Sequence, residues 1–305
     1  MFEKILFATN GLPSCQNAAD VAFDLARKYK SHLLLFHILG IPTRGFSPYV
    51  VDVATGEKRD LDQQFLDTVR QRLLETYRDQ LEKCPDYELE VLAGVPHAEI
   101  LRAARKRDVD LIVMGAQSEQ DHDLTRFRPV AGHTMQRVAK GARCPVLIIN
   151  RPCQTCWGYF ANIIFSTDFS PAADSAFKFA LALARQIGSM LYIFHACDLS
   201  ALAPGKEVAQ DQVENMVQEA RGKIEELYLS QMGDFENYQV EVWEGIPYVE
   251  ILKFCRERHG DLIVMAHHAR EQAGGEAELG STIEQVVLRA NCPVVSVNRP
   301  HKVEG

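Results

Sequence analysis

Short apolar runs rich in β-branched residues alternate along the chain with longer segments whose apolar positions recur at helical spacing. In the first half the short runs predict strands at residues 4–9, 32–38, 88–92, 110–114 and 146–149. The longer segments predict helices near residues 14–29 (with Ser14 as N-cap), 61–83, from 96 onward and 132–140, and a loop at 40–57. This alternation is typical of βαβ units and predicts a parallel sheet flanked by helices.

The second half repeats this pattern element for element. The segments ILFATN, GVPHAEIL and CPVLIINRP of the first half recur as IIFSTD, GIPYVEIL and CPVVSVNRP. Strands are predicted near residues 162–167, 190–195, 238–243, 261–265 and 293–297, and helices near 171–187, 206–231, 248–258 and 280–290. The duplication predicts two α/β domains of five parallel strands, at residues 1–152 and 161–300, with a linker at 153–160 and a tail at 301–305. Because the linker is short, we expect the domains to pack as an intramolecular pseudo-dimer.

The composition, the net charge and the length of the apolar runs argue against several classes of protein. The chain has 305 residues, of which 47% are hydrophobic and 24% charged, as in a globular protein with room for two cores. A formal net charge of −8 argues against nucleic-acid binding. No apolar run approaches the roughly 20 residues of a membrane span, and the N-terminal segment lacks a signal-peptide core. We therefore expect a cytoplasmic protein that binds neither nucleic acid nor membrane, with its scattered cysteines reduced.

In each half a polar loop rich in small residues separates the fourth predicted strand from the last predicted helix. In a parallel sheet such a loop leaves the carboxyl end of a strand and leads to a helix N-terminus. Backbone N–H groups and the helix dipole there favour an anion such as a phosphate. These two loops are therefore the first candidates for a ligand site.

Taken together, these features resemble the universal stress protein family, as a tandem two-domain member. The resemblance covers essentially all of residues 1–300. It rests on the ILFATN/IIFSTD strand, the G-[VI]-P-x-x-E-I-L segment, DLIVM followed by Gly or Ala, and a late helix start followed by Cys-Pro-Val. It implies a Rossmann-like or flavodoxin-like fold of the adenine nucleotide alpha hydrolase-like type. It also implies dimer formation through the last strand, here as a homodimer, and a stress-related regulatory role.

Some members of that family bind ATP through a Gly-x2-Gly-x9-Gly-[Ser/Thr] loop, with an Asp at the end of the first strand. The first half departs from this pattern in loop length and in most residues. Its corresponding positions are Asn10, Gly115, Ser118, Gly132 and His133, with Thr134 one residue further on. The second half keeps the Asp and the helix start but replaces both early glycines. Its corresponding positions are Asp168, Ala266, Ala269, Gly280, Ser281 and Thr282.

The early glycines permit positive φ and a close approach of the backbone to phosphate, so replacing them weakens the cradle. The glycine and hydroxyl at the helix start survive best in the second half. The resemblance therefore implies that ATP, with or without Mg²⁺, or a related nucleotide binds the second half in preference to the first. The alternative is that each loop only connects a strand to a helix, with Asp168 capping the helix that follows it.

Two histidines, His37 and His195, stand at equivalent positions near the ends of the second predicted strands. They are candidates for a pocket wall at the carboxyl edge of the sheet, or for hydrogen-bonded structural roles. The pair at 267–268 in the second loop could face an anion when protonated, or only solvent. Glu99 and Glu250, on the third predicted helix of each half, are expected on solvated faces.

Cys153 and Cys156 form the only closely spaced cysteine pair in the sequence. The pair lies in the linker, which disfavours a thioredoxin-type site. A zinc site would need two further ligands, and no second such pair exists, so zinc is not expected. No catalytic set stands out. Three functions remain open: a nucleotide-responsive regulatory protein, an interaction or scaffold protein, and, ranked last, a metal-dependent or slow ATP-hydrolysing activity.

Overall fold

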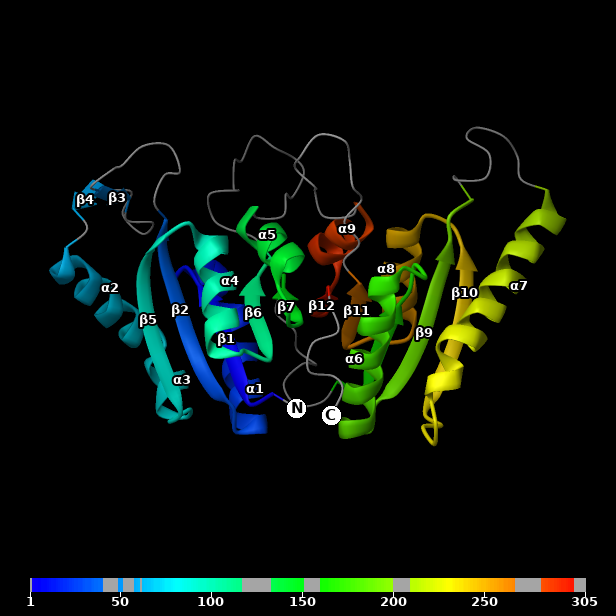
Figure 1. Cartoon of the computed structure of the whole chain (residues 1–305), viewed down its shortest axis with the longest axis horizontal. Coiled ribbons are helices and arrows are strands. Elements are labelled where there is room, and N and C mark those ends of the chain that lie inside the picture. Colours follow the sequence, from blue (N-terminus) through cyan, green and yellow to red (C-terminus); the bar gives the residue numbers. More distant parts are fainter. Residues whose placement is uncertain are drawn as a thin grey trace. The chain divides into compact units, whose positions relative to one another are not determined.

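The structure, a computed structural model, describes residues 2–40, 49–51, 58–60, 62–116, 133–150, 160–199, 209–266 and 281–298. The chain divides into two compact units, unit 1 (Met1–Ile149) and unit 2 (Asn150–Gly305). Each unit carries a parallel β-sheet with helices on its faces (Figure 1). The prediction of tandem α/β domains, each with a five-stranded parallel sheet flanked by helices, is therefore confirmed.

The sheet of unit 1 has the strand order β5-β2-β1-β6-β7, and each neighbouring pair is parallel. Its strands are β1 (Lys4–Thr9), β2 (His32–Gly40), β5 (Tyr87–Gly94), β6 (Leu111–Gly115) and β7 (Val146–Ile149). Its helices are α1 (Gln16–Tyr29), α2 (Gln63–Thr76), α3 (Arg78–Glu82), α4 (Pro96–Arg107) and α5 (His133–Gly141). The central strands are buried along nearly their whole length, as expected for a parallel sheet covered on both faces.

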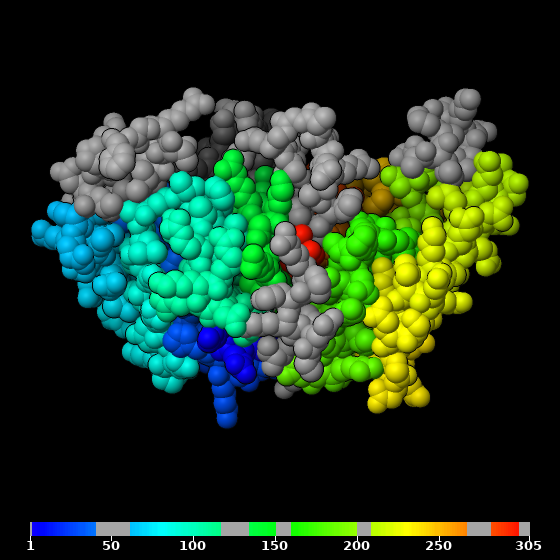
Figure 2. Space-filling model, in the orientation of Figure 1, coloured from blue at the N-terminus to red at the C-terminus, as the bar shows by residue number. Residues whose placement is uncertain are grey.

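The sheet of unit 2 has the equivalent order, β10-β9-β8-β11-β12. Its strands are β8 (Asn162–Ser166), β9 (Met190–Cys197), β10 (Tyr238–Glu244), β11 (Leu262–Ala266) and β12 (Val294–Val297). Its helices are α6 (Pro171–Ile187), α7 (Gln210–Leu227), α8 (Pro247–Glu257) and α9 (Ser281–Arg289), with a 3₁₀ turn η4 (Leu229–Gln231). Helix α7 forms part of the surface of unit 2, where its residues are coloured yellow-green to yellow (Figure 2).

The predicted strands agree with the observed ones to within two residues at each end. The single helix predicted at 61–83 is instead two helices, because the backbone at Tyr77 leaves the helical region (φ −108°, ψ 19°). The loop predicted at 40–57 also contains β3 (Tyr49–Val51), which pairs with β4 (Lys58–Asp60) in an antiparallel ribbon. This ribbon lies against β2, a tertiary contact that local periodicity does not reveal.

The prediction that Ser14 caps the first helix was wrong. Pro13–Cys15 form a 3₁₀ turn, η1, and α1 starts only at Gln16, with no side-chain cap. Proline suits the first position of such a turn, since its missing N–H is not needed there. Among the described residues, the buried hydroxyl oxygen of Ser14 has no hydrogen-bond partner.

Glu99 and Glu250 do not lie on solvated helix faces, which corrects a second prediction. Each occupies the first turn of its helix, α4 or α8, and its side chain is only 15% exposed. The two side chains fold over Gly94 and Gly245, where an added Cβ would lie 2.7 Å and 2.8 Å from the glutamate Cγ. The glycine of each G-[VI]-P-x-x-E segment therefore makes room for the glutamate five residues later.

Aromatic side chains fill the core of unit 2 between β9, β10 and α8. Trp243 meets Phe194 and Phe254 edge-on, with ring centroids 5.6 Å and 5.2 Å apart. Phe194 and Phe254 stack on each other at 4.5 Å. The ammonium group of Lys253 lies 5.2 Å from the centre of the Trp243 ring, a cation–π contact. These contacts hold α8 against the outer strands of the sheet.

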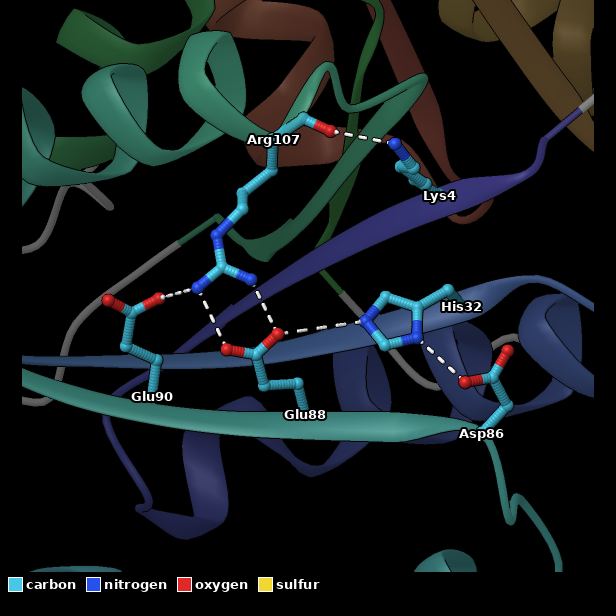
Figure 3. Close-up of polar contacts among 6 residues, drawn as sticks. All are labelled: Lys4, His32, Asp86, Glu88, Glu90 and Arg107. Carbon is cyan, nitrogen blue, oxygen red and sulfur yellow. Dashed lines mark hydrogen bonds and ion pairs between the residues drawn. The ribbon is translucent and has the colours of Figure 1, made fainter.

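An ion-pair network holds the C-terminal end of α4 on β5 (Figure 3). Arg107 donates two hydrogen bonds to Glu88 and one to Glu90. The bonds from Arg107 lower the pKa of the Glu88 carboxyl. The carbonyl oxygen of Arg107 accepts a 3.2 Å bond from Lys4, and His32 Nε2 lies 3.9 Å from Glu88. The network therefore joins α4 to three strands of the sheet.

Candidate functional site

Both sheets change their winding direction at their first strand. In unit 2 the chain runs from β8 to β9 and β10 on one side, and then crosses to β11 and β12 on the other side of β8. The strand that follows β8 in the sequence therefore lies on one side of β8, and the strand that follows β11 lies farther out on the other side. Ligands of open α/β sheets bind outside the carboxyl ends of the strands at such a switch point. Unit 1 has its own switch point between β1 and β6.

A cluster of hydrogen-bonded side chains lies at the carboxyl end of β8 in unit 2. The hydroxyl of Thr167 lies 2.6 Å from the buried hydroxyl of Tyr228 and accepts a 2.9 Å bond from the N–H of Phe169. The carbonyl oxygen of Thr167 accepts a 2.8 Å bond from Nδ1 of His195. Thr167, Tyr228 and His195 come from segments far apart in the sequence, and we call them the Thr–Tyr–His cluster of unit 2.

Unit 1 contains the same cluster. The hydroxyl of Thr9 lies 2.7 Å from that of Tyr77 and accepts a 2.9 Å bond from the N–H of Gly11. The carbonyl oxygen of Thr9 accepts a 2.9 Å bond from Nδ1 of His37. Burial raises the pKa of both tyrosines, to about 12 for Tyr228, so both hydroxyls stay protonated at neutral pH. The hydrogen-bonded role considered for the two histidines is thus observed for their Nδ1 atoms.

Asp168 and Asn10 follow the cluster threonines directly. Each uses Oδ1 to accept a 3.0 Å hydrogen bond from the N–H two residues ahead, that of Ser170 or Leu12. These Asx-turns fix the chain direction at the strand end. Asp168 therefore shapes the turn before α6 and does not cap the helix, whose N-cap is Ser170. The Asp168 side chain is exposed, so a carboxylate is held at the edge of the sheet.

An aromatic and a basic group accompany Asp168 in unit 2. The ring of Phe169 lies 4.4 Å from that of His195, and the ammonium group of Lys223 lies 5.7 Å from the Phe169 ring centre. Burial lowers the pKa of His195, and its neutral ring donates from Nδ1, which leaves Nε2 as an acceptor. Phe169 has a φ of 60°, a left-handed conformation that costs a non-glycine residue on the order of 1–3 kcal/mol.

Unit 1 differs from unit 2 around its cluster. Gly11 stands in place of Phe169 with a φ of 73°, and an added Cβ would come within 2.9 Å of Leu73. His37 is buried, with 4% of its surface exposed, whereas His195 is only partly buried. Unit 1 therefore has the same Thr–Tyr–His hydrogen bonds as unit 2, but it lacks the carboxylate and the aromatic ring that accompany them in unit 2.

The remaining predicted site residues fall partly within the described residues. Ala266 and Gly115 end β11 and β6, beside the ends of β8 and β1. Thr282 and Thr134 lie in the first turns of α9 and α5 and are partly buried. Ser281 begins α9, and its side chain is outside the described part. Also outside the described residues are Ser118, Gly132, Ala269, Gly280, His267, His268, Cys153 and Cys156.

The sequence reasoning missed Tyr77 and Tyr228. A signal for them exists, because the segment ETYRDQ at 75–80 recurs as ELYLSQ at 226–231, with the same spacing to the G-[VI]-P segment in both halves. Helical periodicity assigns a tyrosine at such a position to the core. It gives no indication that the hydroxyl has a partner at the end of a strand.

The described residues hold neither a cluster suited to a metal ion nor a helix suited to a membrane. Within those ranges, no three His, Cys, Asp or Glu side chains gather where they could hold a metal ion. In the same part of the chain, no helix combines the length and the apolar character needed to cross a membrane.

A family model and individual relatives of known name all point to the same protein family. The model for the "Universal stress protein family" matches residues 1–150 and 160–298. Universal stress protein MJ0531 of Methanocaldococcus jannaschii is 29% identical over 161 residues, which make up 51% of this chain and 92% of that protein. Universal stress protein YxiE of Bacillus subtilis is 26% identical over 158 residues, or 49% of this chain and 99% of that protein. Each of these relatives matches about half of the chain.

A solved structure matches the chain over both halves. It is a universal stress protein from Archaeoglobus fulgidus, aligned over 97% of this chain and 96% of its own with a TM-score of 0.63. The two sequences are 20% identical, so this likeness concerns the fold alone.

Proposed function

The chain belongs to the universal stress protein family, and from this premise we propose that unit 2 binds an adenine nucleotide, ATP or a close relative, in a stress-related regulatory role. The proposed site lies outside the carboxyl ends of β8, β9 and β11. One observation carries the proposal: Asp168 holds an exposed carboxylate at the switch point of the sheet, fixed by its Asx-turn.

The chemistry of Asp168 suits the sugar or base of a nucleotide. A carboxylate accepts hydrogen bonds from ribose hydroxyls or from the adenine amino group. Because Oδ1 is already bound to the N–H of Ser170, the side chain is oriented before a ligand arrives. Binding then costs little side-chain entropy, which favours affinity.

Phe169, His195 and Lys223 supply complementary groups beside that carboxylate. An aromatic ring offers a surface on which a base can stack. The acceptor nitrogen of neutral His195 can take a hydrogen bond from a ligand, and the exposed ammonium group of Lys223 can approach a phosphate. The left-handed backbone of Phe169 also supports a functional role. A glycine would adopt this conformation without strain, yet the chain has a phenylalanine at this position.

Helix α9 supports the phosphate end of the proposed site. It follows β11, the strand next to β8, and has Thr282 in its first turn. The N–H groups and dipole of a helix N-terminus favour an anion. Mg²⁺ would enter this site as the counter-ion of ATP.

Titration calorimetry with ATP and Mg²⁺ tests the proposal with a matched variant. Asp168→Asn gives unit 2 the residue that unit 1 carries, and an Asn side chain keeps the Asx-turn while it removes the charge. Loss of a charge-assisted hydrogen bond, about 1.5–3 kcal/mol, should weaken binding roughly 10- to 100-fold. The control Asn10→Asp adds the charge to unit 1, and we expect it to create no second site there.

Native mass spectrometry of freshly purified protein gives an independent test. Adenine nucleotide that co-purifies with the chain would support the proposal. If none co-purifies, and millimolar ATP with Mg²⁺ gives neither heat nor a thermal shift, the proposal fails. The chain would then be an interaction protein whose loops only pack. Release of phosphate from ATP by the wild-type protein would favour the slow hydrolytic activity instead.

Three further predictions accompany this proposal: packing of the units as a pseudo-dimer, a homodimer through the last strand, and a cytoplasmic location. Sedimentation velocity on the full chain measures its oligomeric state. A single species with the mass of one chain at micromolar concentration would contradict the homodimer.

A further inference from the structure

Two buried thiols of unit 2 face each other away from the proposed nucleotide site. The sulfur of Cys255, in the last turn of α8, lies 3.4 Å from that of Cys292, which precedes β12. The two residues are 1% and 6% exposed. Packing alone does not require two thiols there, because unit 1 has Ala104 and Cys144 at the equivalent positions and also buries them.

We propose that Cys255 and Cys292 form a reversible disulfide on exposure to hydrogen peroxide, so that unit 2 carries a redox-sensitive cross-link. A disulfide requires sulfur atoms about 2.05 Å apart, so the pair must close from 3.4 Å by roughly 1.4 Å. Small side-chain rotations can supply this movement, since the sulfurs already touch. Cys255 lies in the last turn of α8 and Cys292 lies two residues before β12, and the ends of helices and strands open locally more easily than their middles.

Each of the two thiols can take either role in the reaction. Either sulfur can donate the hydrogen bond that joins them, and the Cys255 thiol also lies 3.6 Å from the carbonyl oxygen of Gly260. The cysteine that loses its proton reacts as the thiolate. The other, still a thiol, resolves the product.

The reaction takes two steps. The thiolate of one cysteine attacks one oxygen of hydrogen peroxide, the O–O bond breaks, and the leaving hydroxide takes a proton and becomes water. The sulfur of the other cysteine then attacks the resulting sulfenic acid, the S–S bond forms, and the S–O bond breaks to release a second water with the thiol proton. The two sulfurs together lose two electrons, and the peroxide gains them. A dithiol reductant reverses the cross-link by exchange.

Burial restricts which oxidant can act. At 1% and 6% exposure, the sulfurs are closed to a bulky disulfide such as oxidised glutathione, whereas hydrogen peroxide is little larger than water. The cross-link would join α8 to the entrance of β12 and close a loop that contains β11 and α9. A cross-link over such a loop restricts the unfolded chain, so the oxidised unit should melt at a higher temperature.

The test uses the full-length protein, reduced and then treated with hydrogen peroxide. We expect the intact mass to fall by the mass of two hydrogen atoms for this link. Non-reducing peptide mapping should join the peptides that hold Cys255 and Cys292, and dithiothreitol should reverse the link. Oxidised glutathione at the same concentration should not produce it. A disulfide between Cys153 and Cys156 would lower the intact mass by the same amount. The peptide mapping, and not the intact mass, therefore shows which cysteines are linked.

Matched variants separate this pair from other thiols. Cys255→Ala gives unit 2 the residue found at the equivalent position of unit 1, and it should abolish the link and the peroxide-dependent rise in melting temperature. Cys144→Ser, in unit 1, should leave both unchanged. Ala104→Cys places a thiol at the position that corresponds to Cys255 and should create an equivalent link to Cys144.

Two results would overturn the proposal. One is over-oxidation of either cysteine to a sulfinic or sulfonic acid with no disulfide formed in the folded wild-type protein. The other is both thiols remaining unmodified in folded protein under excess peroxide, shown by complete alkylation after unfolding.

Discussion

At the scale of single residues, the buried contacts between Thr9 and Tyr77 and between Thr167 and Tyr228 define the candidate site. The threonines stand at the ends of strands that the apolar runs predict correctly. The tyrosines were not predicted as partners, because side-chain hydrogen bonds between distant elements depend on how the elements pack. Sequence alone could therefore locate the carboxyl edge of the sheet, but not the Thr–Tyr hydrogen bonds that lie there.

The first residue-scale prediction concerns Tyr228→Phe. It removes a hydroxyl that bonds Thr167, and we expect the free energy of unfolding to fall by about 1–2 kcal/mol. Tyr77→Phe should have a similar effect in unit 1. Tyr29→Phe is the control, because among the described residues the buried Tyr29 hydroxyl has no partner, so its removal should cost little. Denaturant unfolding measures all three, and equal losses for Tyr228→Phe and Tyr29→Phe would contradict the prediction.

The second concerns His195 and pH. Burial lowers its pKa in the folded state below the roughly 6.5 of the unfolded chain, so the unfolded state binds the proton first as the pH falls. The stability contribution is full above about pH 6.5 and is lost as the pH drops towards the folded pKa. His195→Asn keeps a donor for the Thr167 carbonyl without titrating. Unfolding free energies from pH 7 to 5 should decline less in the variant, and parallel declines would refute the assignment.

At the scale of elements, the turns before α4 and α8 have the same sequence pattern but different backbones. Both glycines carry a glutamate side chain above them, while only Gly245 has a left-handed φ, of 139°. The repeat predicted both helix starts correctly. It did not predict the difference in φ, because the two segments share the residues that set the local pattern.

This difference gives an element-scale prediction. Gly245→Ala should destabilise the protein by about 1–3 kcal/mol through backbone strain. Gly94→Ala should cost less, since its clash is with the flexible Glu99 side chain and its φ is not left-handed. Thermal unfolding of both variants measures the difference. Should Gly94→Ala prove equally damaging, the clash with the glutamate side chain, and not the backbone φ, causes most of the destabilisation.

The arginines at the ends of α4 and α8 show a second limit of sequence reasoning. Arg107 pairs with Glu90, and Arg258 with Glu241, at 2.9 Å and 3.0 Å. Charged residues in these segments look like solvent-facing positions in the sequence. Their pairing depends on where a helix ends over the sheet, which is set by the packing of the whole unit.

At the scale of the molecule, duplication made the fold predictable. Two copies of one alternating pattern gave the strand positions, the helices and the parallel sheets before the structure. The duplication predicts no common course for the two candidate loops, because they differ in length and in the positions of their glycines. Ala269 and Gly280 lie outside the described residues. The asymmetry between the copies was visible as Asn10 against Asp168, but its structural meaning needed the Asx-turns and the neighbouring rings.

That asymmetry gives a whole-molecule prediction: one nucleotide per chain, bound in unit 2. Unit 1 presents an amide, a glycine and a buried histidine where unit 2 presents a carboxylate, a phenylalanine and a partly exposed histidine. Titration and native mass spectrometry should both give a stoichiometry of one for the wild-type chain, and Asp168→Asn should bind the nucleotide more weakly. Two nucleotides per chain would contradict the assignment.

The placement of Trp243 among Phe194, Phe254 and Lys253 has a spectroscopic consequence. The sequence holds two tryptophans, Trp157 and Trp243, and both belong to unit 2. Indole emission therefore reports on that half of the chain, while the other half emits only through tyrosine. Tryptophan emission thus follows unit 2 selectively, without a label, as ligand or oxidant is added.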